Sequence, residues 1–149
     1  MALDQSFKGR TYPSSWVYEV SRAKIKEFAD AIGDSNPIYV DAEAARAAGH
    51  PDVLAPPTFV TIVNLRAIGV IIHDPELGLD YGRMVHGDQS FSYARPIHAG
   101  DRLTITMHVD DIMTRAGNDF LWVRAEINTE DGEPVCVAHA QLVVRGAGD

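Results

Sequence analysis

The first third of the chain carries apolar residues at the spacing of a helix. Four of them recur at i, i+3, i+4 and i+7, and so share one face: Ile25, Phe28, Ala29 and Ile32. Ser21 precedes this stripe as an N-cap, and Gly33 follows it in the position that favours a left-handed C-terminal residue. The pattern therefore predicts one helix between Ser21 and Gly33, with a single buried stripe.

Two further helices follow before residue 73. Asp41 is the expected N-cap of a short alanine-rich helix over residues 42–48, which Gly49 ends. A longer apolar segment, Thr58 to Ile72, comes after two prolines, so its helix is expected to start at Pro56 or Pro57. Its apolar residues cover most of the circumference: Phe59, Ile62, Val63, Leu65, Ile68 and Val70. Such a helix is expected to be surrounded by protein.

The second half of the chain has the two-residue period of strands. An opening strand is expected over residues 11–20. Four more are expected over residues 84–93, 103–109, 120–129 and 135–145, separated by Gly-, Pro- and Asp-rich turns.

This order of elements predicts one α+β domain in which a curved antiparallel sheet wraps around the 58–72 helix. The domain spans residues 1–149, with a core over about residues 7–145 and a tail at 146–149. Wrapping a sheet around one helix covers only its inner face. The exposed edges and the outer face are therefore expected to pair with a second subunit.

Composition narrows the function classes. The net charge is −8 and the chain has no basic stretch, which argues against a nucleic-acid surface. Arg83, Arg95 and Arg102 are the candidates for a local positive patch that receives a phosphorylated carrier. No segment is long and apolar enough to span a membrane, and no leader pattern opens the chain, so a cytoplasmic location is expected. The single cysteine, Cys136, is expected to be a buried structural thiol.

The segment from Asp34 to Tyr39 contains most of the candidate chemistry. An acid followed five residues later by histidine can move a proton on an acyl thioester, but here the fifth residue is Tyr39. Pro56 and Pro57 then stand where such an enzyme needs backbone N–H donors at a helix start, and proline has none. The histidines show no metal-ligand spacing, so no metal and no cofactor are expected.

Three stretches of the chain resemble the hot-dog fold of MaoC-like hydratases and dehydratases. They are residues 33–39 with 44–49, residues 51–59, and His86-Gly87-Asp88-Gln89 running into residues 96–101. The resemblance covers about residues 7–145 and is closest to the fatty-acid-synthase-type (3R)-hydroxyacyl dehydratase subunits of actinobacteria. In catalytic members the first stretch reads Asp, Asn-Pro, His, and the second carries His-Gly where this chain has Pro56-Pro57.

The resemblance implies that this chain is the acyl-binding subunit of a (3R)-3-hydroxyacyl-thioester dehydratase or hydratase of fatty-acid metabolism. It would form a dimer with a catalytic hot-dog chain and bind the fatty acyl group of an acyl-carrier-protein or coenzyme A thioester. The substrate-binding residues it implies are Asn36, Tyr39, Thr58, Phe59, Ile62, Val63, Asp88 and Gln89. Phe59, Ile62 and Val63 would line an acyl tunnel.

Other hypotheses stay open at this point. A self-sufficient homodimer would use His86 with Asp34 or Asp88 for acid–base work. A non-enzymatic protein would bind acyl thioesters without chemistry. A hot-dog thioesterase is disfavoured because no acid lies within the 58–72 segment, although Asp74 and Glu76 follow it.

Overall fold

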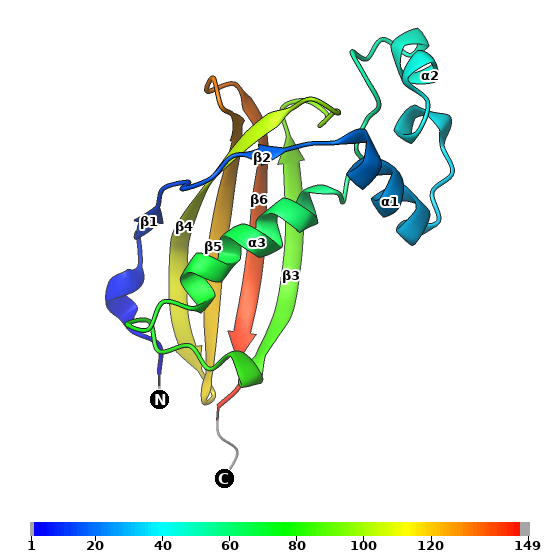
Figure 1. Cartoon of the computed structure of the whole chain (residues 1–149). Coiled ribbons are helices and arrows are strands. Elements are labelled where there is room, and N and C mark those ends of the chain that lie inside the picture. The colour runs from blue at the N-terminus through cyan, green and yellow to red at the C-terminus, as the bar shows by residue number, and fades with distance from the viewer. Residues whose placement is uncertain (1, 147–149) are drawn as a thin grey trace.

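A six-stranded antiparallel sheet forms the centre of the molecule (Figure 1), and the computed structural model describes residues 2–146. The strand order is β1-β4-β5-β6-β3, with β2 also pairing with β4. The strands are β1 (Thr11–Tyr12), β2 (Tyr18–Glu19), β3 (Met84–Tyr93), β4 (Arg102–Arg115), β5 (Asn118–Thr129) and β6 (Pro134–Val144). The predicted α+β hot-dog architecture is confirmed.

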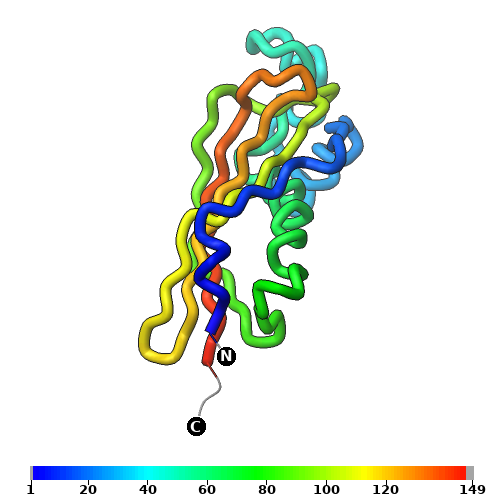
Figure 2. The backbone as a smooth tube through the Cα atoms, turned by 90° about the vertical axis from the view of Figure 1, so that its left-hand side faces the viewer, coloured from blue at the N-terminus to red at the C-terminus, as the bar shows by residue number. Residues whose placement is uncertain are grey.

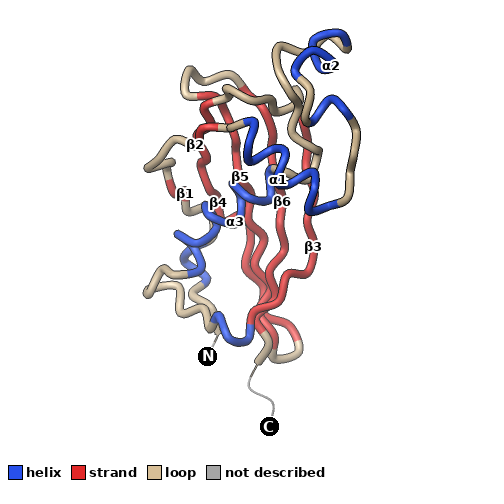
Figure 3. The backbone as a smooth tube through the Cα atoms, turned by 45° about the vertical axis from the view of Figure 1, so that its right-hand side comes forward, coloured by secondary structure: helices blue, strands red, loops and turns tan. Residues whose placement is uncertain are grey.

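One helix, α3 (Val60–Ile72), lies across one face of this sheet, while α1 (Arg22–Ile32) and α2 (Ala42–Ala47) lie near one end of it. Figure 3 shows α2 at a corner of the molecule, beyond the ends of the strands. Short 3-10 turns occupy Gln5–Phe7, Pro37–Tyr39 and Tyr81–Arg83. Figure 2 shows α3 on one side of the sheet, and no described helix covers the other side.

Alternation along the strands makes the inner face apolar. Leu103, Ile105, Met107 and Val109 of β4 are at most 3% exposed, as their two-residue period predicts. The matching inner residues of β5 are Leu121, Val123, Ala125 and Ile127, also at most 2% exposed. Each large apolar side chain buried in this layer stabilises the fold by roughly 1.5–3 kcal/mol. The layer between α3 and the sheet is therefore the hydrophobic core.

The structure corrects two predictions for the central helix. It begins at Val60 rather than at Pro56 or Pro57, because tight turns come first: Phe59 N–H donates to the Pro56 carbonyl at 2.9 Å. The helix is also not enclosed on all sides, since Leu65 is 56% exposed and Val70 is 43% exposed. Two apolar side chains of α3, about 140° apart around the helix, thus remain uncovered within the described chain.

The predictions for the two earlier helices are largely confirmed. The Ser21 hydroxyl accepts from Lys24 N–H at 3.1 Å to cap α1, and Gly33 ends it with φ +73°. The Asp41 carboxylate caps α2. The prediction that Ile32 is buried is wrong, because its side chain is 48% exposed at the last turn.

The expected opening strand is two short strands, because Pro13 cannot donate to the ladder. Between them, the Ser14 hydroxyl accepts from Ile105 N–H at 3.1 Å and holds the segment against β4. The later strands all occur, and β4 extends six residues past the predicted end at Val109, to Arg115. Leu3 is also buried, and its N–H donates to Asp119 at 3.1 Å. The predicted tail lies outside the described residues apart from Gly146.

Asp101 ends the turn before β4 and anchors it. Asp101 is 6% exposed, and its carboxylate accepts hydrogen bonds from both terminal nitrogens of Arg95 at 2.9 Å and from His98 N–H at 3.0 Å.

Because hydrogen bonds to a buried charged group are worth about 1.5–3 kcal/mol, Asp101→Asn is expected to lower the free energy of unfolding by about that amount. Urea denaturation measures it. The control is Glu130→Gln, which removes the exposed ion pair of Glu130 with Arg102 and is expected to cost less than about 1 kcal/mol. Equal losses of stability in the two variants would contradict the anchoring role of Asp101.

Candidate functional site

The 34–39 segment is a self-bonded turn. The Asp34 carboxylate accepts from Asn36 N–H at 3.1 Å, and the Asn36 side-chain oxygen accepts from Ile38 N–H at 3.2 Å. Pro37 then opens the 3-10 turn that ends at Tyr39. Both polar side chains are exposed, so they cap the turn and still present their remaining oxygen lone pairs to solvent.

Tyr39 occupies the position of the missing histidine and is buried, with 8% of its surface exposed. Burial raises the pKa of its phenol above the ordinary 10.0, and the neighbouring Asp34 carboxylate raises this pKa further by its charge and by a hydrogen bond. A phenol in this environment ionises less readily than free tyrosine. Tyr39 is therefore a poorer base near neutral pH than an unperturbed tyrosine.

The start of α3 offers few backbone donors. Pro56 and Pro57 have no N–H, and the N–H of Phe59 is used in the turn that precedes the helix. The Tyr93 hydroxyl on β3 donates to the Pro57 carbonyl and ties this turn to the sheet. The helix start is therefore built from internal contacts and lacks the free amides at positions 56 and 57 that would hold an oxyanion.

The expected tunnel residues are not equally accessible. Phe59 is fully buried between Tyr18 and Phe28, with ring centroids 6.4 and 5.6 Å away in edge-on contacts. Val63 is also fully buried, Ile62 is partly buried, and Thr58 is exposed. In this conformation Ile62 and Thr58 present surface to a ligand, while Phe59 and Val63 belong to the core.

A bulge at Gly87 sets the direction of the side chains on β3. Register places His86 opposite Leu142, and Gln89 opposite Ala140, with the irregularity between His86 and Asp88. Leu142 and Ala140 are inner-face residues, so His86 and Gln89 both face the α3 side although they are three residues apart. A Cβ at position 87 would come within 2.8 Å of the Gln141 side-chain oxygen.

Asp88 faces the opposite side of the sheet. It pairs with Gln141, and with Asp110, Trp122 and His139 it lines a hollow of about 340 Å³ on the outer face. Its carboxylate accepts from Gln89 N–H at 2.9 Å. Within one chain, the structure therefore separates Asp88 from the other implied binding residues.

Sequence patterns missed Asn64, which lies on the buried face of α3 with 1% of its surface exposed. Its side-chain amide nitrogen donates to the Gln89 side-chain oxygen at 3.4 Å, and the Gln89 amide nitrogen donates to the His139 carbonyl at 2.8 Å. The signal that could have revealed it is a single amide in an otherwise apolar helix segment, VTIVNLRAIGVII. A buried polar residue in such a position needs a partner.

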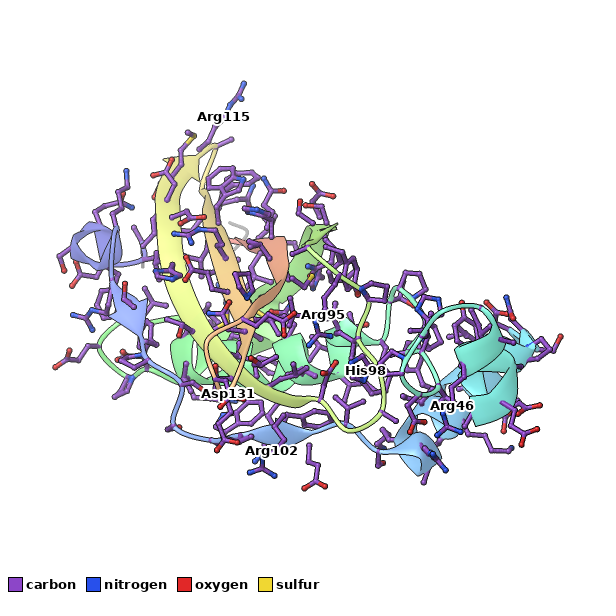
Figure 4. All side chains as sticks on the ribbon, turned by 90° about the horizontal axis from the view of Figure 1, so that it is seen from above. Arg46, Arg95, His98, Arg102, Arg115 and Asp131 are labelled. Carbon is purple, nitrogen blue, oxygen red and sulfur yellow. The ribbon has the colours of Figure 1, made fainter. Side chains whose placement is uncertain are left out.

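The three arginines expected to form a positive patch are each paired with acids. Arg95 binds Asp101 and Glu133, and Arg102 binds Glu130 at 2.7 Å. Arg83 lies 3.3 Å from Asp80. Figure 4 shows Arg46 on α2 and Arg115 at the far end of the molecule, so these two cations do not form a patch either. Arg83 precedes β3 and Arg95 follows it, so the ten residues of this strand separate them and the three arginines do not form the single patch that could have received a carrier.

Asp74, weighed for water activation, lies at the other end of α3. The helix has 13 residues, which is about 20 Å at 1.5 Å per residue. Asp74 accepts from the Tyr12 hydroxyl at 2.9 Å and from Glu76 N–H at 3.0 Å, so it ties the first strand to the helix end.

Cys136 is buried as predicted, and burial raises the pKa of its thiol to about 11. Across residues 2–146, no three His, Cys, Asp or Glu side chains gather as metal ligands would. None of the described helices combines the length and apolar character needed to cross a bilayer.

The raised pKa of Tyr39 gives a test of its environment. The phenol is expected to ionise above pH 10, which the difference in absorbance at 295 nm between the wild type and Tyr39→Phe measures. A group whose pKa is higher in the folded state than in the unfolded state stabilises the fold at pH values below its unfolded pKa. This contribution to stability is lost as the pH rises through the folded pKa. The contribution of Tyr39 to stability should therefore be constant below about pH 10 and fall above it. A titration midpoint below 10 would contradict this description.

Comparison with known proteins agrees with the fold. A protein of Saccharopolyspora erythraea, named UPF0336 protein, is 60% identical over 149 residues, covering 100% of this chain and 96% of its own. The HadBC (3R-hydroxyacyl-ACP dehydratase) complex of Mycobacterium tuberculosis contains a chain with 29% identity and a TM-score of 0.85. The match covers 96% of this chain and 99% of that one.

A chain of the ChsH1-ChsH2 complex of the same organism is 25% identical, with a TM-score of 0.68. That match covers 94% of this chain and 85% of the other. Both of these solved structures are complexes of two named subunits. The family model described as "FAS1-like, dehydratase domain region" matches residues 6–138. The chain therefore belongs to this FAS1-like dehydratase-region family of hot-dog proteins.

Proposed function

We propose that this chain is the acyl-binding subunit of a (3R)-3-hydroxyacyl-thioester dehydratase or hydratase that acts in fatty-acid metabolism. A partner hot-dog chain would supply the catalytic acid and base. The observation that carries the proposal is the coincidence of two losses in one chain. A buried tyrosine replaces the expected base, and prolines replace the expected amide donors.

Each loss is large in kinetic terms. Dehydration removes a proton from C2 and protonates the hydroxyl that leaves C3, and a positioned acid–base group contributes about 10²–10⁴-fold to such a step. One missing oxyanion donor costs about 2.7–4 kcal/mol of transition-state stabilisation. Asp34 is retained, but its carboxylate bonds to Asn36 N–H and lies beside a phenol rather than an imidazole.

The edge of the sheet at β3 supports partner binding. β3 is the terminal strand of the described sheet and has ten residues. It contains neither lysine nor proline, which commonly protect an exposed edge, and its protection is confined to the bulge at Gly87 and the charge of Asp88. Three large side chains are between 36% and 56% exposed: Val85 and Tyr93 on β3, and Leu65 on α3. A second hot-dog chain pairing along β3 would cover these apolar side chains.

The acyl group is proposed to lie along α3. Ile62 and Thr58 are the implied residues with accessible surface, and Leu65 adds an exposed apolar side chain on the same helix. Asn36 and Tyr39 would close the end near α1, and Gln89 would contribute from β3. Phe59 and Val63 would contact the ligand only if the aromatic cluster around Phe59 opened.

The relatives support a paired arrangement, since the HadBC and ChsH1-ChsH2 structures are complexes of two chains. The alternative is a homodimer in which His86 performs acid–base work with Asp34 or Asp88. His86 does face the α3 side and is exposed. However, Asp88 faces the other side of the sheet within the same chain.

Reconstitution with a partner tests the proposal. Co-expression with a hot-dog chain that carries Asp-x-Asn-Pro-x-His is expected to give a heterodimer that dehydrates 3-hydroxyacyl thioesters, while this chain alone is inactive. Absorbance of the enoyl thioester near 263 nm measures turnover, and the partner alone is the control. Turnover by this chain alone at the rate of the pair would refute the proposal.

His86→Ala separates the two dimer hypotheses. In the reconstituted pair the change is expected to alter kcat by less than about threefold, because no proton transfer is assigned to His86. A homodimeric enzyme that uses His86 as its base would instead lose about 10²–10⁴-fold. His50→Ala, at a partly buried histidine, serves as a control, since this residue precedes the 51–59 stretch and is assigned no role.

A further inference from the structure

Among the described residues, the buried side-chain atom that lacks a hydrogen-bond partner is Nε2 of His108. His108 lies on β4 between the buried residues Met107 and Val109, so its ring points to the outer face of the sheet. A buried polar atom without a partner costs free energy, and native structures contain few such atoms. A contact that engages this nitrogen would therefore stabilise the structure.

The His108 ring lies where three strands meet. Its register partners are Thr11 on β1 and Arg124 on β5. The Nδ1 atom is 3.0 Å from the hydroxyl oxygen of Thr11. The Nε2 atom is 3.5 Å from the Oε1 carboxylate oxygen of Glu126, also on β5. One ring therefore stands between β1, which belongs to the N-terminal arm (residues 2–12), and the centre of the sheet.

The charges beside His108 favour one more positive charge. On the outer face, Arg124 donates to the Asp110 carboxylate at 3.3 Å and to Oε1 of Glu126 at 2.6 Å. Two carboxylates and one guanidinium give this row one net negative charge. His108 stands at the end of the row, beside Glu126. A protonated imidazole at this position makes the row neutral.

The charged groups on the other elements around the ring are directed elsewhere. On the N-terminal arm, the cations Lys8 and Arg10 form ion pairs with other acids. On β6, His139 lies one strand further away, beyond β5. Helix α3 packs against the inner face of the sheet, opposite to the ring (Figure 2). Glu126 is therefore the carboxylate that the His108 ring faces.

The contact between His108 and β1 lies next to the bonds that hold the N-terminal arm. Gly9 N–H donates to the Val109 carbonyl at 2.8 Å, and Val109 N–H donates to the Arg10 carbonyl at 3.0 Å. The arm also carries Leu3 and Phe7, which are 3% and 1% exposed. A change at His108 therefore bears on whether the arm stays closed over this end of the core.

We propose that His108 is a proton-dependent latch, whose protonated ring donates Nδ1–H to the Thr11 hydroxyl and Nε2–H to the Glu126 carboxylate and so holds the N-terminal arm against β4 and β5. A neutral ring carries one hydrogen. Either its Nε2 then faces Glu126 bare, or the contact with Glu126 lacks the positive charge that strengthens it. Protonation adds a donor and a charge, and it therefore favours the closed arm. This inference does not depend on the proposed function.

The latch has a defined pH range. Imidazole side chains ordinarily gain their proton between about pH 5 and 8, whereas glutamate stays ionised down to about pH 4.3. The latch is closed when His108 is protonated and Glu126 is ionised, and it loosens as the pH rises through neutrality. An open arm would expose Leu3 and Phe7 and would unpair β1 from the edge of β4.

Amide hydrogen exchange measured by NMR on the whole chain tests the latch. The reporters are the amides of Gly9 and Val109, with Val123 at the centre of the sheet as the reference for global opening. Relative to that reference, their protection factors are expected to be about fivefold higher at about pH 5.5 than at about pH 7.5. This is the upper end of the range for exposed ion pairs (about fivefold), because Nε2 itself is buried. His108→Gln, which is uncharged at both pH values, is expected to abolish the difference.

Two further variants distinguish the latch from a purely structural role. His139→Gln removes another histidine of the outer face and should leave the ratio between the two pH values unchanged. Glu126→Gln keeps His108 but removes the carboxylate, and it should lower the ratio to at most about twofold. This variant provides a readout if His108→Gln fails to fold. Equal protection at the two pH values in the wild type, or a full ratio that survives His108→Gln or Glu126→Gln, would overturn the inference.

Discussion

The structure depends on one constraint: a single helix can cover only one face of the sheet. The inner residues of β4 and β5 form a continuous apolar layer that must be removed from water, and α3 supplies the matching surface. Once this layer is formed, the outer face, the β3 edge and the outward flank of α3 stay uncovered within the described chain. The features that make the fold stable therefore also leave the surfaces on which a second hot-dog chain would bind.

Periodicity in the sequence predicted most of this architecture because burial is one-sided along each element. The alternation Leu103, Ile105, Met107, Val109 identified the inner face of β4, and Ser21 and Gly33 located both ends of α1. The failures arise where local propensity competes with specific geometry. The prolines before α3 form turns instead of its first helical turn, and Pro13 divides the opening strand. Leu65 is apolar yet exposed, and hydrophobic periodicity alone does not show which apolar positions of a helix the chain itself covers.

The candidate site was predictable in its chemistry but not in its arrangement. Asp34, Asn36 and Tyr39 are near one another because they are close in sequence, and the structure adds the burial that raises the pKa of Tyr39. The bulge at Gly87, by contrast, turns His86 and Gln89 to one face and Asp88 to the other, which residue counting alone does not reveal. Asn64 could not be identified from its spacing, because its significance comes from a contact with Gln89, 25 residues away.

The proposed division of roles between two subunits would account for these observations together. This chain retains a helix with two exposed apolar side chains, a buried amide pair and an open strand edge, while the position that should hold a base contains a buried phenol. The most direct measurement is exchange of the C2 hydrogens of a saturated acyl thioester in deuterated water, followed by mass spectrometry. The account predicts no exchange above the uncatalysed background with this chain alone, and exchange when a chain with an intact Asp–His pair is added. Deuterium incorporation by the isolated chain at the rate of the pair would contradict it.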